Sequence, residues 1–159
     1  ALFAEGKYVQ AFPKFGVERR GAPVEAFLRL DTEKILIRSE IEQPDHVVVL
    51  DHPLIDVIDV TAGLAENGWI LINTDLKPLD FTELAQFRVA CVNASRIAAD
   101  LGLGSRSAPI VNTGICGSFA QCTGLVKLQS VCDAIKEEAP IKAAENAQAA
   151  TIAFNTTII

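Results

Sequence analysis

The stretch Pro44-Asp45-His46-Val47-Val48-Val49-Leu50-Asp51-His52-Pro53 decides the fold. Its centre, residues 46–50, is a run of mostly β-branched residues, and polar residues and prolines bound it on both sides. A run that is apolar on both faces is typical of a strand buried on both sides of a parallel sheet. Two later runs, Trp69-Ile70-Leu71-Ile72-Asn73 and Val89-Ala90-Cys91-Val92-Asn93, have the same character. The sequence therefore predicts three buried parallel strands.

Helical patterns alternate with these strands. Residues 61–67, ended by Gly68, predict a helix between the first two strands. Residues 95–101 predict another helix after the third strand, with Ser95 as its cap and Gly102 as its stop. Three more helices are predicted over residues 112–120, 128–138 and 142–154. This order predicts a single α/β domain over residues 1–159, a Rossmann-like, doubly wound and mostly parallel sheet with helices on both faces.

A loop between two further strand-like runs is the first candidate site. Tyr8 to Phe12 and Pro23 to Leu30 read as strands, and the glycine- and proline-bounded loop between them holds the adjacent residues Arg19 and Arg20. Binding residues are often found in loops that a rigid scaffold holds. Guanidinium groups donate hydrogen bonds in pairs to phosphate or carboxylate oxygens. The two arginines are therefore candidates for binding an anionic group.

Composition excludes several classes of function. The net charge of −6 and the pI near 4.9 argue against nucleic acid as the main partner, because phosphate neutralisation needs surplus lysine and arginine. No apolar run reaches the roughly 18–20 residues of a membrane helix, and no membrane contact is expected. The first residues do not resemble a secretion signal, so we expect a cytoplasmic protein.

The cysteines and histidines do not predict a metal site. Cys91, Cys116, Cys122 and Cys132 match neither a zinc pair nor an iron–sulfur cluster in their spacing, which favours reduced, structural thiols. The two histidines, at 46 and 52, flank a predicted strand, where capping or surface roles are more common than catalysis. Gly114 and Gly117, spaced three apart in a predicted helix, are expected to permit close packing.

The residues also resemble a known family. The motif Tyr8-Val9-Gln10-Ala11-Phe12-Pro13-x-Phe15-Gly16-x-Glu18-Arg19-Arg20-Gly21-Ala22-Pro23-Val24 resembles the gamma subunit of pyruvate:ferredoxin oxidoreductase and of related 2-oxoacid:acceptor oxidoreductases. The resemblance continues through residues 44–51, 68–74 and 109–120, in the same order, and so spans nearly the whole chain.

This resemblance implies a share in a multi-subunit enzyme. Such complexes carry out the coenzyme A-dependent oxidative decarboxylation of a 2-oxoacid, here expected to be pyruvate, and pass the electrons to ferredoxin. Thiamine diphosphate, Mg²⁺ and the [4Fe-4S] clusters would lie on partner subunits of alpha, beta and delta type, so this chain would hold no complete active site. A 2-oxoisovalerate or other branched or aryl 2-oxoacid stays open as the substrate.

The resemblance also implies a role for the arginine loop. In single-chain relatives the matching loop faces coenzyme A. Arg19 and Arg20 are therefore expected to pair with coenzyme A phosphates, while Gly16 and Gly21 allow the backbone to approach closely. Asn112, at a predicted helix start, is the second candidate contact. The alternative is that the arginines pair with acidic groups of this chain or a neighbouring subunit, in a purely structural role.

The first residues lead to one more expectation. Residues 1–6 look like the end of a helix followed by its glycine stop. Gamma subunits of this family begin with a glycine-rich turn that these 159 residues do not contain. We therefore expect a strand and most of a helix before Ala1, whose absence would leave a gap at the centre of the sheet.

Overall fold

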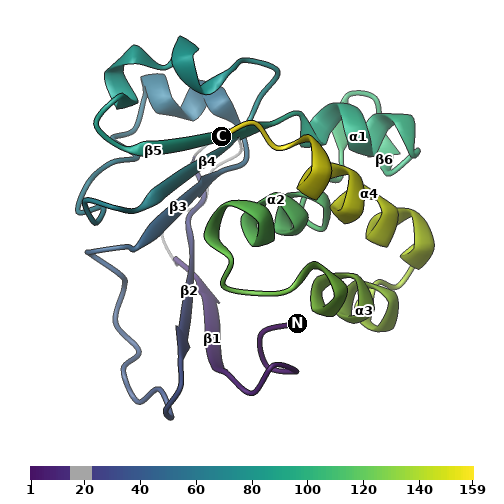
Figure 1. Ribbon diagram of the computed structural model, residues 1–159, viewed down its shortest axis with the longest axis horizontal. Helices are drawn as coiled ribbons and strands as arrows, with labels where there is room; N and C mark the ends of the chain where they lie inside the picture. The colour runs from purple at the N-terminus through teal and green to yellow at the C-terminus, as the bar shows by residue number, and fades with distance from the viewer. Residues whose placement is uncertain (15–22) are drawn as a thin grey trace.

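A three-stranded parallel sheet carries apolar clusters on both of its faces. The computed structural model describes residues 1–14 and 23–159 (Figure 1). The strands β3 (His46–Val49), β4 (Trp69–Asn73) and β5 (Arg88–Val92) pair in the order β3-β4-β5 and run parallel. Every residue of β4 is buried. The three predicted strands are thus confirmed, with small differences at their ends. The expected burial of the first run on both sides is wrong, because β3 is an edge strand in which only Val49 is buried.

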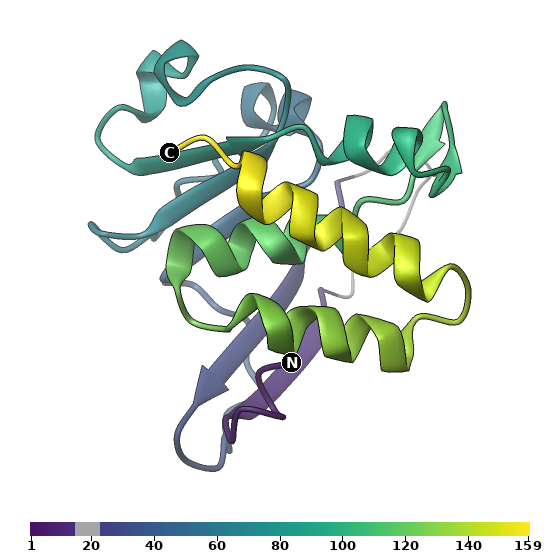
Figure 2. The same ribbon diagram turned by 45° about the vertical axis from the view of Figure 1, so that its right-hand side comes forward.

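Four α-helices follow β5 in the chain: α1 (Ala94–Asp100), α2 (Gly114–Thr123), α3 (Leu128–Glu138) and α4 (Ala143–Thr156). Helices α1, α2 and α4 supply the side chains that pack on one face of the sheet, against Trp69, Leu71 and Val92. Helix α3 packs on α2 and α4, and these three helices enclose a second apolar cluster (Figure 2). All the α-helices in the described part of the chain therefore belong to one layer.

The other face of the sheet is covered by short 3₁₀ helices and turns. These helices are η1 (His52–Asp56), η2 (Pro78–Asp80) and η3 (Thr82–Leu84), which lie in the connections between the parallel strands. Ile70 and Ile72 point to this side and pack in a cluster with Phe81 and Leu84. The mixed α/β class is confirmed, and the second layer consists of 3₁₀ turns rather than long helices.

The helix expected over residues 61–67 is wrong, because these residues form turns. The Asp59 carboxylate accepts hydrogen bonds from the backbone N–H of Thr61, at 3.0 Å, and from its hydroxyl, at 2.6 Å. These bonds have the geometry of a helix cap, but the Ala65 backbone N–H then bonds to the Pro44 carbonyl, at 3.0 Å, and not to a carbonyl within the segment. Gly63 then adopts φ = +70°, a left-handed conformation that ends any helical run.

The cap of α1 also differs from the expectation. Asn93, and not Ser95, caps the helix, since the Asn93 Oδ1 accepts a hydrogen bond from the backbone N–H of Arg96 at 2.8 Å. Ser95 lies inside the first turn and contacts Asn73 instead. The helix itself is confirmed.

The first six residues form one helical turn with a glycine stop, as expected. The backbone N–H of Glu5 bonds to the Ala1 carbonyl at 3.2 Å, and that of Lys7 bonds to the Leu2 carbonyl at 3.2 Å. Gly6 between them has φ = +81°.

The sheet has β3 as an edge strand, and Val48 on this strand is 39% exposed. The strand expected before Ala1 stays a prediction.

Two small antiparallel hairpins complete the described elements. β1 (Tyr8–Pro13) pairs with β2 (Ala26–Asp31), which confirms the two predicted strands around the arginine loop, and β6 (Gly104–Ser105) pairs with β7 (Ala108–Pro109). Among the described residues, no helix combines the length and apolar character that crossing a bilayer requires.

The four cysteines are free, and three of them are buried. Burial raises the pKa of Cys91 and of Cys122 to about 11 in each case. Both thiols therefore stay protonated at neutral pH, and protonated thiols are poor nucleophiles and poor metal ligands.

Helices α2 and α4 approach closely at one glycine. A Cβ atom added to Gly117 would overlap the backbone carbonyl of Ala150 on α4, whereas one added to Gly114 would meet only the Ala149 Cβ, at 3.7 Å. The predicted close packing is therefore confirmed, and Gly117 is the residue that requires it.

This difference gives a matched pair of variants. Gly117→Ala should lower the free energy of unfolding by about 1–3 kcal/mol, the usual cost of overpacking, because backbone cannot move aside as a side chain can. Gly114→Ala should be neutral or slightly stabilising, since alanine favours the helix over glycine. Urea unfolding of both variants checks this, and equal effects would contradict the assignment.

His46 is expected to make stability depend on pH. Its Nδ1 accepts a hydrogen bond from the backbone N–H of Trp69 at 3.1 Å, which only the neutral imidazole can do. Burial lowers the pKa of His46, the Arg88 charge lowers it further, and Asp45 partly opposes both.

Because the folded state binds this proton less readily than the unfolded state, stability should be complete above the unfolded pKa, about 6.5, and fall as pH decreases below it. His46→Gln should flatten this part of the profile. Thermal unfolding between pH 5 and 8 measures the slope, and an unchanged slope in the variant would rule His46 out as its source.

Candidate functional site

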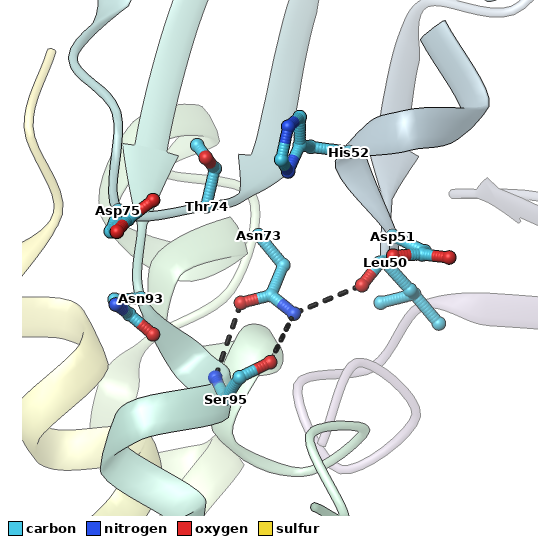
Figure 3. A pocket seen from close by; sticks show the side chains of 8 residues that line it. All are labelled: Leu50, Asp51, His52, Asn73, Thr74, Asp75, Asn93 and Ser95. Atoms are coloured by element: carbon cyan, nitrogen blue, oxygen red, sulfur yellow. Dashed lines mark hydrogen bonds between the residues drawn. The ribbon is translucent and has the colours of Figure 1, made fainter. Parts of the chain in front are cut away.

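A polar crevice lies at the carboxyl edge of the parallel sheet. Ligands of open α/β sheets bind at this edge, outside the ends of the strands. The crevice has a volume of about 290 Å³, close to the lower end of the usual ~300–1,000 Å³ range for ligand pockets (Figure 3). It is lined by Leu50, Asp51, His52, Asn73, Thr74, Asp75, Asn93 and Ser95.

The Asn73 side chain holds the walls of the crevice together. Its Nδ2 donates to the Leu50 carbonyl and to the Ser95 Oγ, both at 2.9 Å, and its Oδ1 accepts from the Ser95 backbone N–H at 3.2 Å (Figure 3). These bonds join the end of β4 to the segment after β3 and to the start of α1. Asn73 is 8% exposed, so its bonds are shielded from water. Its role is to position the crevice.

Two hydroxyl groups remain able to donate into the crevice. The Ser95 Oγ accepts the bond from Asn73, and the Thr74 Oγ1 accepts one from the Leu76 backbone N–H at 3.2 Å. Each hydroxyl then still has its own proton to donate. Asp51 and Asp75 add carboxylate acceptors at the rim of the crevice (Figure 3).

The charge of the lining selects among ligand groups. Asp51 and Asp75 are its acidic residues, and no lysine or arginine stands among the lining residues named above. Carboxylates repel phosphate and accept hydrogen bonds from hydroxyl and amino groups. The crevice therefore suits the uncharged, hydrogen-bonding part of a ligand. Within the described ranges, no group of three or more His, Cys, Asp or Glu side chains is placed to hold a metal ion.

The residues predicted from sequence lie apart from this crevice or outside the described residues. Arg19, Arg20, Gly16 and Gly21 belong to the segment 15–22, which the structure does not describe. Asn112 is exposed, does not line the crevice, and accepts a bond from the Thr113 N–H at 3.0 Å. These five assignments stay predictions.

Sequence reasoning missed the crevice residues as a set. Asn73, Thr74 and Ser95 follow or end buried strands, and carboxyl ends of parallel strands meet at one edge of a sheet. The polar residue that follows each apolar run could have indicated a site at the carboxyl edge of the sheet. His46, by contrast, has the structural role expected of it, while His52 lines the crevice.

Removing the Asn73 amide should destabilise the protein. Asn73→Ala would leave the Leu50 carbonyl and the Ser95 backbone N–H without their partner, at a cost of about 1–3 kcal/mol for a buried unsatisfied group. Asn155→Ala, at an exposed position of α4, is the control and should change little. Urea unfolding measures both, and a neutral Asn73→Ala would contradict the positioning role.

Comparisons with known proteins agree with this fold. The model of the family described as pyruvate ferredoxin/flavodoxin oxidoreductase matches residues 1–156. The chain is 51% identical over 164 residues to the pyruvate/ketoisovalerate oxidoreductases common subunit gamma of Thermococcus kodakarensis, covering 100% of this chain and 86% of the relative. It is 48% identical to the pyruvate synthase subunit PorC of Methanothermobacter marburgensis, covering 97% of this chain and 83% of the relative.

A solved structure shows the same architecture. The crystal structure of the pyruvate oxidoreductase subunit PORC from Thermotoga maritima superposes with a TM-score of 0.79 at 29% identity, covering 98% of this chain and 83% of that one. The resemblance seen in the motif of residues 8–24 is thus confirmed over nearly the whole chain. The chain belongs to the pyruvate ferredoxin/flavodoxin oxidoreductase family, in which its relatives include proteins named as gamma subunits and as PorC subunits.

Proposed function

We propose that this chain is the gamma subunit of a pyruvate:ferredoxin oxidoreductase and that it helps to bind coenzyme A. In the overall reaction, a 2-oxoacid loses CO₂, its acyl group forms a thioester with coenzyme A, and two electrons reduce ferredoxin. The observation that carries the proposal is 51% identity, over the full length of this chain, to a gamma subunit named for pyruvate and ketoisovalerate oxidoreductases.

Other subunits would hold the reaction centre. Alpha-, beta- and delta-type subunits would supply thiamine diphosphate with Mg²⁺ and the [4Fe-4S] clusters, which do the carbon and electron chemistry. The spacing of the four cysteines in this chain fits no cluster motif. The task left to this chain is to bind and orient the coenzyme.

The charges of the crevice and of the arginine loop support a division of the coenzyme contacts between these two regions. The crevice is lined with carboxylates and disfavours phosphate. Arg19 and Arg20 are suited to the coenzyme phosphates, with Gly16 and Gly21 permitting close approach of the backbone. Asn112 remains a further candidate for a polar contact.

Two alternatives stay open, one for the 2-oxoacid that the complex uses and one for the role of this chain. The printed name of the Thermococcus relative refers to both pyruvate and ketoisovalerate oxidoreductases, so a branched-chain 2-oxoacid is the second candidate substrate. A subunit common to two enzymes would leave the choice of 2-oxoacid to its partners. The other alternative is a purely structural subunit whose arginines bind a neighbouring chain.

Single arginine variants test the coenzyme role. Arg19→Ala and Arg20→Ala should each raise the KM for coenzyme A at least several-fold in the assembled complex, because a hydrogen bond to a charged group contributes about 1.5–3 kcal/mol. Partial reactions without coenzyme A should persist. Arg106→Ala, which removes an exposed arginine near the β6–β7 hairpin, is the matched control. An unchanged KM in both test variants would support the structural role.

The substrate is tested on the native complex. Purified complex should reduce a viologen dye when supplied with pyruvate and coenzyme A together. A panel of 2-oxoacids then ranks the substrates by kcat/KM. Faster turnover of 2-oxoisovalerate would replace pyruvate as the substrate, and dye reduction independent of coenzyme A would contradict the proposed reaction.

A further inference from the structure

One side of the crevice carries hydrogen-bond donors beside an acceptor. Figure 3 shows Thr74, Asp75 and Asn93 on the same side of the Asn73 amide. Thr74 keeps its hydroxyl proton, because its Oγ1 accepts from the Leu76 backbone N–H. The Asn93 Oδ1 is occupied as the cap of α1, so the amide N–H groups of this side chain are the part left to donate.

This combination of groups is complementary to a secondary amide. An amide offers one N–H to a carboxylate and one carbonyl oxygen to a hydroxyl group. The Asp75 carboxylate is the acceptor, and the hydroxyls of Thr74 and Ser95 are the donors. A phosphate only accepts, so it would satisfy the hydroxyls and set a like charge against the carboxylate. An uncharged amide satisfies both kinds of group.

The volume of the crevice limits the ligand to one part of coenzyme A. The crevice has about 290 Å³, at the lower end of the range for pockets that hold a whole ligand. Coenzyme A consists of a nucleotide that carries all of its phosphate groups and of an uncharged arm, pantetheine, that contains amide bonds and a hydroxyl group. The crevice therefore suits one end of the coenzyme.

Charge decides between the two ends. The ribose of the nucleotide has a phosphate at its 3′ position and a diphosphate at its 5′ position, so phosphates flank it on both sides. In the crevice these phosphates would face Asp51 and Asp75, with no lysine or arginine among the lining residues to offset the repulsion. The pantetheine arm brings no charge, and its amides match the donors and the acceptor of the lining.

We propose that the crevice binds the pantetheine arm of coenzyme A. An amide N–H of the arm donates to the Asp75 carboxylate, and an amide carbonyl accepts from the Thr74 or the Ser95 hydroxyl. This inference rests on the proposed function, which supplies the coenzyme. The Asn73 Nδ2 donates to the Ser95 Oγ at 2.9 Å, and this bond directs the proton of the Ser95 hydroxyl away from Asn73 and leaves it for a ligand.

Neutralising Asp75 separates the two ends of the coenzyme by the sign of the effect. Asp75→Asn, made in the gamma chain of the assembled complex, removes a charged acceptor with little change of shape. The KM for coenzyme A should rise about tenfold, the loss expected for one hydrogen bond to a charged group. The value of kcat should change little, because the arm is bound equally in the ground state and the transition state. A nucleotide in the crevice would instead be relieved of repulsion, and the KM would fall.

Asp133→Asn is the matched control for this variant. Asp133 is exposed on α3 and does not line the crevice, and its replacement changes the net charge of the chain by the same amount. The KM for coenzyme A should therefore stay unchanged in Asp133→Asn. A rise in both variants would trace the effect to the net charge and not to the crevice.

Two fragments of the coenzyme locate the effect. S-Methylpantetheine has the arm without the nucleotide, and adenosine 3′,5′-bisphosphate has nucleotide phosphates without the arm. Both are measured as competitive inhibitors against coenzyme A. Asp75→Asn should raise the Ki of S-methylpantetheine by the same factor as the KM for coenzyme A and leave the Ki of the bisphosphate unchanged. An effect on the bisphosphate alone would overturn the proposal.

A second variant keeps the test valid if Asp75→Asn assembles poorly. Thr74→Val removes the hydroxyl with little change of shape and should raise the KM for coenzyme A about threefold, the loss expected for an uncharged hydrogen bond. Thr156→Val, at an exposed position of α4, is its control and should leave the KM unchanged. The amount of gamma chain in each purified complex shows whether the variant is folded and assembled.

The outcomes distinguish this assignment from the proposed function. A KM for coenzyme A that is unchanged or lower in both Asp75→Asn and Thr74→Val would overturn the assignment of the crevice and leave the coenzyme role of the chain standing. Dye reduction by the wild-type complex that does not depend on coenzyme A would contradict the proposed function, and with it this assignment.

Discussion

The complete burial of β4 is the constraint on which the rest of the structure depends. A central parallel strand has both faces and both edges covered, so Trp69 to Asn73 must be supplied with two apolar layers and two neighbouring strands. The α-helical layer covers one face and the 3₁₀ turns cover the other. At the end of this strand the first polar residue, Asn73, is still buried. Its amide must find partners, and those partners are the backbone and hydroxyl groups that line the crevice.

The strands were predictable because each is a run of apolar residues, although only β4 is buried at every residue. The apolar runs of β3, β4 and β5 need no knowledge of their partners, and the hairpin was equally visible as two runs around a turn. The helix predicted over residues 61–67 does not form because Gly63 is left-handed and the Ala65 N–H bonds to the Pro44 carbonyl, outside the segment. A prediction from the residue pattern of a whole segment cannot detect the effect of a single hydrogen bond or a single glycine. The Asn93 cap was missed for the same reason, since Asn93 and Ser95 are both good caps and only geometry decides between them.

The candidate site was predictable only in part. The arginine loop could be found from the sequence, and the crevice could not. Arginines in a loop stand out on an acidic chain, so the sequence singles out Arg19 and Arg20 without any structure. The crevice has no such signal, because Asn73, Thr74 and Ser95 are ordinary polar residues that become neighbours only when the strands align. Residues 22 positions apart, such as Asn73 and Ser95, meet through the parallel register of β4 and β5. Sequence reasoning without a topology cannot place them together.

The arginine loop and the crevice differ in charge, so they suit different ends of a ligand that is anionic at one end. A net charge of −6 disfavours the approach of an anion except where cations are concentrated. The lining of the crevice adds to that repulsion, so the crevice suits only the uncharged groups of a phosphate-bearing ligand, and the arginine loop stays the proposed place for the phosphates. The loop, however, is carried by a hairpin with no buried residue. A ligand bound from this hairpin would stabilise the hairpin in turn, because binding to the folded state alone shifts the folding equilibrium towards it.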